Sequence, residues 1–139
     1  MTETVETLFD RGFERYKAGE GPETLIPVFR EISDRAPRSA AAWTSLAWLY
    51  LLADKPKSAL KTAREAVKCD PRAPQARVNL ALALLETETK GVRQQIDIVA
   101  QMAALDSEIR QEIESNIEDG LARKPDWKHL QRVKRWLFE

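Results

Sequence analysis

Residues 40–73 read AAAWTSLAWLYLLADKPKSALKTAREAVKCDPRA, and this stretch decides the fold. Its apolar residues recur at helical spacing in two segments, which Pro56 separates, and Pro71 closes the second segment. The first segment is rich in large residues and the second in small ones: Trp43, Leu46, Ala47 and Tyr50, then Ala59, Ala63 and Ala66. The stretch therefore predicts two helices joined by a short turn.

The same stretch resembles a tetratricopeptide repeat, a helix–turn–helix unit of about 34 residues. Its first helix fits the pattern W-x2-L-G/A-x2-Y of that family, and its second helix has the family's small residues and closing proline. The matching positions are Trp43, Leu46, Ala47, Tyr50, Ala59, Ala63, Ala66 and Pro71. The small residues would let the two helices approach closely, while the large ones fill the space to the next pair.

Weaker copies of the pattern flank this repeat. Residues 6–39 and 74–107 each resemble a further repeat, whereas residues 108–139 carry no repeat signature. A single helix pair cannot bury its own apolar face, so flanking pairs are required. The resemblance implies an all-α fold, a right-handed α-solenoid of about three helix–turn–helix units. Two C-terminal capping helices bring the expected total to about eight helices, which form one domain over residues 1–139.

The flanking repeats depart from the pattern at their turns. The turn at residues 19–21 should hold one extra residue, and the turn at residues 87–91 should be lengthened. Pro27 lies among apolar residues, so its helix should begin near Glu23 or Thr24 to keep the proline in the first turn. Gly120 and Pro125 read as breaks between the last helices.

Composition excludes several classes of protein. The chain has 139 residues, with 22 Lys and Arg against 22 Asp and Glu, so it lacks the basic excess of a general nucleic-acid coat. One cysteine and one histidine exclude an intrachain disulfide and the common metal sites. The first residues do not read as a secretory signal, and no apolar stretch is long enough to span a bilayer. We expect a soluble cytoplasmic protein.

The resemblance also implies a binding surface. In this family the first helix of each pair lines a concave groove, where partner peptides or helices usually bind. The register of the middle repeat, carried over to the other two pairs, predicts a mostly apolar and aromatic groove. In the first pair the register is defined to within one residue. The predicted lining is Phe9, Phe13, Thr44, Ser45, Trp48, Leu52, Gln75, Asn79, Leu82 and Glu86. Ala41 and Val78 share this face, and Tyr16 extends it in the first helix.

This lining argues against one familiar binding mode. A well-known subfamily grips the C-terminal carboxylate of chaperone tails with Lys, Asn and Arg at defined groove positions. The corresponding positions here lie near Phe9 and Phe13, then at Ser45, Gln75 and Asn79, and none of them is a cation. We therefore do not expect a carboxylate clamp.

Trp48 is the strongest candidate for an energetic anchor, because Trp, Tyr and Arg dominate interface hot spots. Asn79 would hydrogen-bond the backbone of an extended or helical ligand. The alternative for Trp48 is burial under a neighbouring or C-terminal helix, and for Asn79 it is a solvent-facing amide. The sequence leaves both alternatives open.

Residues 126–139, DWKHLQRVKRWLFE, form an amphipathic segment. Trp127, Leu130 and Leu137 fall on one face, and basic residues fall towards the other. The favoured interpretation is a capping helix that covers the end of the solenoid. Two alternatives are a basic helix that binds a partner or a membrane surface, and a helix that occupies the groove until a ligand displaces it.

Charge is sorted along the chain. Basic residues gather between Lys55 and Arg77, and acidic residues between Asp106 and Asp119. The basic run should lie on the convex side, as a solvated helix face or as a surface that steers an acidic partner. An RNA-binding role for it is less favoured, because the run contains no aromatic residue for base stacking.

No motif for catalysis or for cofactor binding stands out. The sequence has no phosphate-binding glycine loop, no dinucleotide fingerprint, no zinc-protease helix and no nucleophile elbow. Cys69 takes an aliphatic position of the repeat and reads as a buried small residue. His129 has no evident carboxylate partner and reads as a surface histidine. We expect no enzyme, no cofactor, no metal and no small-molecule substrate.

Three functions compete. The first is an adaptor or assembly factor that holds a segment of another protein; the chain also resembles small tetratricopeptide proteins of photosynthetic bacteria, some of which help assemble membrane protein complexes. The second is a structural subunit or homodimer that uses the groove as a permanent interface. The third is an RNA-binding helical repeat. Any membrane association is expected only through a partner.

Overall fold

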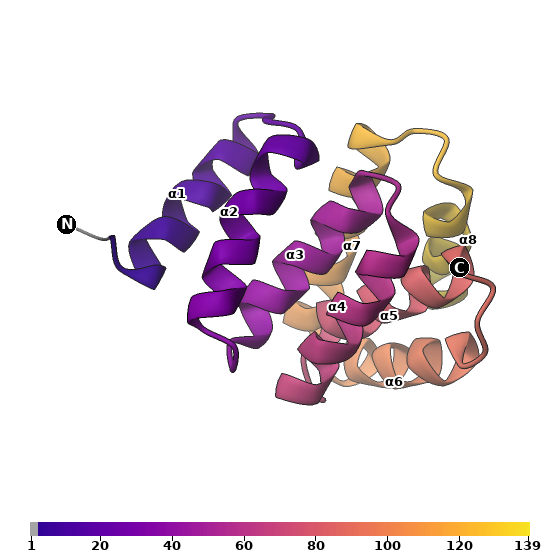
Figure 1. The fold of residues 1–139 in the computed structure, drawn as a ribbon. Helices are drawn as coiled ribbons and strands as arrows, with labels where there is room; N and C mark the ends of the chain where they lie inside the picture. The colour runs from indigo at the N-terminus through magenta and orange to yellow at the C-terminus, as the bar shows by residue number, and fades with distance from the viewer. Residues whose placement is uncertain (1–2) are drawn as a thin grey trace.

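The computed structural model describes residues 3–139, which form eight α-helices and no strand. The all-α class and the number of helices are as the sequence predicted. The first four helices run back and forth as antiparallel neighbours (Figure 1). Their bounds are α1 (Val5–Lys17), α2 (Pro22–Arg35), α3 (Ala40–Leu52), α4 (Pro56–Cys69), α5 (Pro74–Glu86), α6 (Val92–Leu105), α7 (Ser107–Arg123) and α8 (Lys128–Phe138).

Local chemistry fixes where these helices begin. The Thr4 and Ser39 side chains accept hydrogen bonds from backbone N–H groups of the first turns of α1 and α3. Helices α2, α4 and α5 each begin with a proline, whose missing N–H would be unpaired at that position anyway. The boundaries therefore follow from residues that the sequence displays.

The turns inside the helix pairs repeat one backbone feature. Gly19, Asp54 and Glu88 all have positive φ, of 97°, 58° and 54°. Asp54 and Glu88 lie one repeat length apart, since 88 − 54 = 34, and Gly19 lies 35 residues before Asp54. The turn between α1 and α2 is therefore one residue longer, as predicted. The loop between α5 and α6, at residues 87–91, is also lengthened.

Pro27 departs from the expectation. Helix α2 begins at Pro22, so Pro27 lies inside the helix rather than in its first turn. Its neighbours Leu25 and Ile26 are both buried. Packing against the adjacent helices thus outweighs the loss of one helical hydrogen bond.

The middle pair shows why the repeat pattern matters. Ala47 on α3 and Ala59, Ala63 and Ala66 on α4 are all fully buried. Without larger side chains at these positions the two helix backbones approach closely, as the sequence indicated. The large residue Leu46 is buried against α2, and Trp43 and Tyr50 pack against the same cluster.

Helices α7 and α8 fold back against the first helices of the pairs. Ile113 and Ile117 of α7, with Leu130 and Val133 of α8, are buried in one cluster with Leu82 of α5. Figure 1 shows α7 behind α3, with α8 beside α5 and α6. No helix among residues 3–139 is long and apolar enough to cross a membrane.

Candidate functional site

The C-terminal helices cover part of the predicted groove. Trp48, Leu52 and Leu82 belong to the core cluster that also contains residues of α7 and α8. Leu82 has no exposed surface, and Trp48 and Leu52 are each 9% exposed. The expectation of an open apolar groove is therefore corrected at these three residues, because α7 and α8 cover them.

Trp48 faces the concave side, but its ring is packed within the molecule. It contacts Trp127 with ring centroids 5.5 Å apart. It also lies against Gly120, where an added Cβ atom would come within 2.8 Å of the indole ring. The Trp48 indole N–H donates to the Tyr16 hydroxyl at 2.8 Å. Of the two interpretations of Trp48, the geometry matches burial under the C-terminal helices.

Gly120 itself was misread from the sequence as a break. It lies inside α7, three residues before the end of that helix, and is buried. Because a glycine presents no side chain, Trp48 and Leu130 can both approach the backbone of α7 there. The glycine serves helix packing rather than a turn.

Asn79 is neither a ligand-binding amide nor a solvent-facing one. It is fully buried and donates from its side-chain nitrogen to the backbone carbonyl of Thr44 at 2.9 Å. Its side-chain oxygen accepts from Gln75 at 2.8 Å, and the Gln75 oxygen accepts from Asn116 at 2.8 Å. This chain of amides ties α3, α5 and α7 together.

Glu86 holds α8 in place instead of lining an open groove. Its carboxylate accepts from the Trp127 indole N–H at 2.9 Å and lies 3.1 Å from Nδ1 of His129. The expectation that His129 lacks a carboxylate partner is therefore wrong. These contacts join Glu86, the last residue of α5, to the start of α8.

Tyr16, Asp119 and Arg123 connect the two ends of the chain. The Tyr16 hydroxyl donates to the Asp119 carboxylate, and the Arg123 guanidinium lies over the Tyr16 ring, 3.6 Å from its centroid. Arg123 also donates to the Tyr16 backbone carbonyl at 2.9 Å and to Asp119 at 3.1 Å. Burial, followed by the hydrogen bond to Asp119, raises the pKa of the Tyr16 phenol well above its ordinary value.

An open pocket of about 150 Å³ remains at the N-terminal end of the concave face. Phe13 is 47% exposed at its edge. The pocket is lined by Phe13, Tyr16, Phe29, Thr44, Ser45, Trp48, Leu49, Gln75, Asn116 and Asp119. Phe13, Thr44, Ser45 and Gln75 are thus brought together at an accessible site.

Phe9 lies outside this pocket. Its ring packs edge-on against Phe29 of α2, with centroids 5.5 Å apart and an interplanar angle of 77°. One helical turn separates it from Phe13, but it points towards the second helix of its own pair. The predicted lining is corrected at this position.

The pocket combines apolar and polar groups. Aromatic and aliphatic side chains line it together with hydroxyl, amide and carboxylate groups. No lysine or arginine is among the described residues that line it. No group of His, Cys, Asp and Glu among residues 3–139 is arranged to hold a metal ion.

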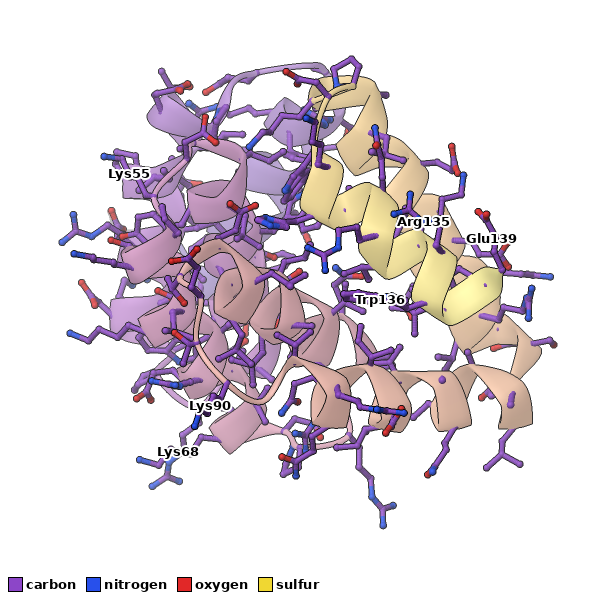
Figure 2. The ribbon with its side chains drawn as sticks, turned by 90° about the vertical axis from the view of Figure 1, so that its right-hand side faces the viewer. Lys55, Lys68, Lys90, Arg135, Trp136 and Glu139 are labelled. Atoms are coloured by element: carbon purple, nitrogen blue, oxygen red, sulfur yellow. The ribbon has the colours of Figure 1, made fainter. Side chains whose placement is uncertain are left out.

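The basic run on α4 lies on the outer surface. Lys57, Lys61, Arg64 and Lys68 are all exposed. Figure 2 shows Lys55 and Lys68 pointing into solvent at the side of the molecule away from α8. Cys69, at the end of α4, is half-buried, and its thiol lies 3.5 Å from the Pro37 carbonyl.

Sequence reasoning missed the contribution of α7 to the pocket. Asn116 and Asp119 line it with polar groups, although residues 108–139 have no repeat pattern to place them. Their spacing of three residues places both side chains on one face of a helix. No signal in the neighbouring sequence indicated that this face lies against α1.

The sequence matches no family model and no curated protein. Among solved structures it is similar to the first TPR of Spaghetti (RPAP3) bound to the HSP90 peptide SRMEEVD. The TM-score is 0.66 at 18% identity, over 85% of this chain and 95% of that one. At that identity the likeness concerns the fold, and it agrees with the eight helices described above. The chain thus has the tetratricopeptide-repeat fold that the sequence predicted.

Proposed function

We propose that this chain is a non-enzymatic interaction module that binds a peptide or helix segment of a partner protein at the open end of its concave face. The binding site comprises Phe13, Thr44, Ser45 and Gln75, together with the pocket beneath them. The role that follows is that of a cytoplasmic adaptor or complex-assembly factor.

The observation that carries this proposal is the half-exposed Phe13 at the edge of an apolar pocket. Phe29, Trp48 and Leu49 also line the pocket, so an apolar side chain that enters it would bury part of its surface against apolar groups. Burying one large apolar side chain contributes about 1.5–3 kcal/mol. Such a pocket is the usual place for an interface hot spot.

The similar structure supports peptide binding in general, because that protein is bound to the HSP90 peptide SRMEEVD. No lysine or arginine is among the described residues that line the pocket, and the ammonium group of Lys17 lies over the ring of Phe13 at its edge, 5.1 Å from the centroid. The ligand we propose is therefore an internal segment with an apolar anchor residue. Hydroxyl groups of Thr44 and Ser45 stand where they can bond its backbone.

Placing a photo-crosslinking phenylalanine analogue at position 13 of the full chain tests this proposal. The protein is expressed in its native host, irradiated, purified and identified with its crosslinked partner by mass spectrometry. We expect one partner segment that crosslinks from position 13, and excess wild-type protein present before irradiation should suppress this crosslink by competition. The Phe13→Asp variant should not compete.

The matched control carries the same analogue at position 105, where Leu105 is 90% exposed and does not line the pocket. Equal crosslinking from positions 13 and 105 would reject the pocket as the site. Crosslinking of position 13 to a second copy of the chain, with twice the monomer mass in light scattering, would favour the homodimer instead.

A further inference from the structure

A second hollow lies on another side of the molecule, between α6 and α8. Its volume is about 480 Å³, larger than the pocket beside Phe13. Leu85, Val92 and Ile96 supply apolar surface, and Arg93 and Asp97 of α6 also line it. Figure 2 shows Trp136 projecting from α8 into the space between the two helices.

Trp136 is a large aromatic side chain that the rest of the molecule leaves half-exposed, as in an interface anchor that has no partner protein bound. It is 44% exposed, whereas Trp48 and Trp127 are buried. The Arg132 guanidinium lies over its ring, 5.0 Å from the centroid, which limits the freedom of the side chain. A large aromatic side chain held at the mouth of a hollow loses little conformational entropy on binding, and tryptophan is the residue most enriched in hot spots.

Three basic side chains lie on or next to the residues of this hollow. Arg93 lines it, Arg132 lies over the Trp136 ring, and Lys128 lies one helical turn before Arg132 on the same face of α8. All three are exposed, and none pairs with a carboxylate among residues 3–139. Asp97 is the one acidic side chain among the described residues that line the hollow. Most other basic residues of α7 and α8 are paired with carboxylates. Arg110 pairs with Glu114, Arg123 with Asp119 and Lys134 with Glu118.

We infer that the hollow between α6 and α8 is a second docking surface, which binds an acidic amphipathic helix of a partner protein. Apolar residues of that helix would cover Trp136 and Ile96, and its carboxylates would pair with Arg93, Lys128 and Arg132. This surface is separate from the pocket beside Phe13. A chain with both surfaces would hold two protein segments at once, as an adaptor requires.

The test uses the full chain and a synthetic peptide of roughly 15 residues with leucine at every third or fourth position and glutamate elsewhere. The control peptide has lysine in place of each glutamate. Binding is measured by fluorescence anisotropy of the labelled peptide. NMR of the indole N–H signals, with the Trp136 signal assigned from its absence in Trp136→Ala, locates the contact.

We expect the acidic peptide to bind and to shift the Trp136 indole signal, and the lysine peptide not to bind. Trp136→Ala should weaken binding about tenfold or more, in the range of a hot-spot truncation. Arg132→Glu should weaken it to a similar extent. Lys68→Glu is the matched control, because it makes the same change of net charge on α4, and it should change affinity less than about twofold. Phe13→Asp should also have no effect.

Any of the following binding results would overturn the inference. Absence of peptide binding, or equal weakening by Lys68→Glu, would mean that no specific acidic helix docks here. Binding to phosphatidylserine vesicles through Trp136, with no binding of the peptide, would make this a membrane surface. A dimer in light scattering that Trp136→Ala dissociates would make it an interface between copies. Unchanged thermal unfolding of each variant shows that the fold is retained.

Discussion

Trp48 and Gly120 fit against each other so closely that an added Cβ atom at Gly120 would lie 2.8 Å from the indole ring. The same atom would lie 2.7 Å from a methyl group of Leu130. Gly120 therefore sets the distance at which α7 crosses α3. This contact closes the C-terminal half of the concave face and leaves only the N-terminal half open.

Gly120→Ala should destabilise the protein, although it places a better helix former inside α7. Helix propensity alone favours alanine over glycine by about 1 kcal/mol. Overpacking a close contact costs about 1–3 kcal/mol, and here the ring of Trp48 and the side chain of Leu130 both stand in the way. We expect a net loss of about 1 kcal/mol, measured by urea unfolding.

Ser115→Ala on the exposed side of the same helix is the control, and it should leave stability unchanged or slightly raised. A Gly120→Ala protein more stable than wild type would contradict the role of Gly120 as a packing residue. Such a result would mean that the helix propensity of alanine outweighs the close contact with Trp48 and Leu130.

Asn79→Ala should be among the most costly polar substitutions. The Asn79 amide is fully buried, and its loss would leave Gln75 without its acceptor and the Thr44 carbonyl without this donor. Leaving a buried polar group unpaired costs about 1–3 kcal/mol. Asn116→Ala, at the half-buried end of the same amide chain, should cost less, because water can replace its bond to Gln75. Equal losses in urea unfolding would contradict this order.

The helix pairs were predictable because their signals are local. The spacing of Trp43, Leu46 and Tyr50 shows one apolar face, and prolines mark the starts of α4 and α5. Even the extra residue in the turn near Gly19 follows from counting between repeats. Each of these signals lies within one unit of the chain, so no knowledge of tertiary contacts was needed.

The covering of the groove was not predictable in the same way. Tyr16 and Asp119 meet across 103 residues of sequence, and no repeat pattern extends through α7 to place Asp119. Trp48 has the right register for a groove residue whether or not another helix lies over it. Gly120 is equally compatible with a break and with a packing contact, and only the position of Trp48 decides between them.

The pH dependence of stability should reveal the environment of Tyr16. Burial and the Asp119 carboxylate raise the pKa of this phenol in the folded protein. The stabilisation is then complete below the pKa of the unfolded chain, about 10, and is lost as pH rises towards the folded value. We expect wild-type stability to fall more steeply above pH 10 than that of Tyr16→Phe, by at most about 1.4 kcal/mol per pH unit, the limit for one proton.

At neutral pH, Tyr16→Phe should itself cost about 1–3 kcal/mol, because the Trp48 indole N–H loses its acceptor in a buried place. Both effects are measured by urea unfolding of the two proteins over a series of pH values. Parallel stability curves above pH 10 would show that Tyr16 titrates as an ordinary exposed tyrosine.

Phe13→Asp separates binding from folding at the pocket. Phe13 is 47% exposed and lies at the edge of the pocket, with Lys17 placed 5.1 Å from its ring centroid. Exposed positions of this kind usually change stability by less than about 0.5 kcal/mol, so the melting curve should barely move. The aspartate would, however, place a charge where the partner must bury an apolar side chain, and capture of the crosslinked partner should be lost. Leu105→Asp, at an apolar residue that is 90% exposed and does not line the pocket, should preserve capture. If Phe13→Asp protein unfolds at the wild-type temperature and still captures the partner, the segment binds elsewhere.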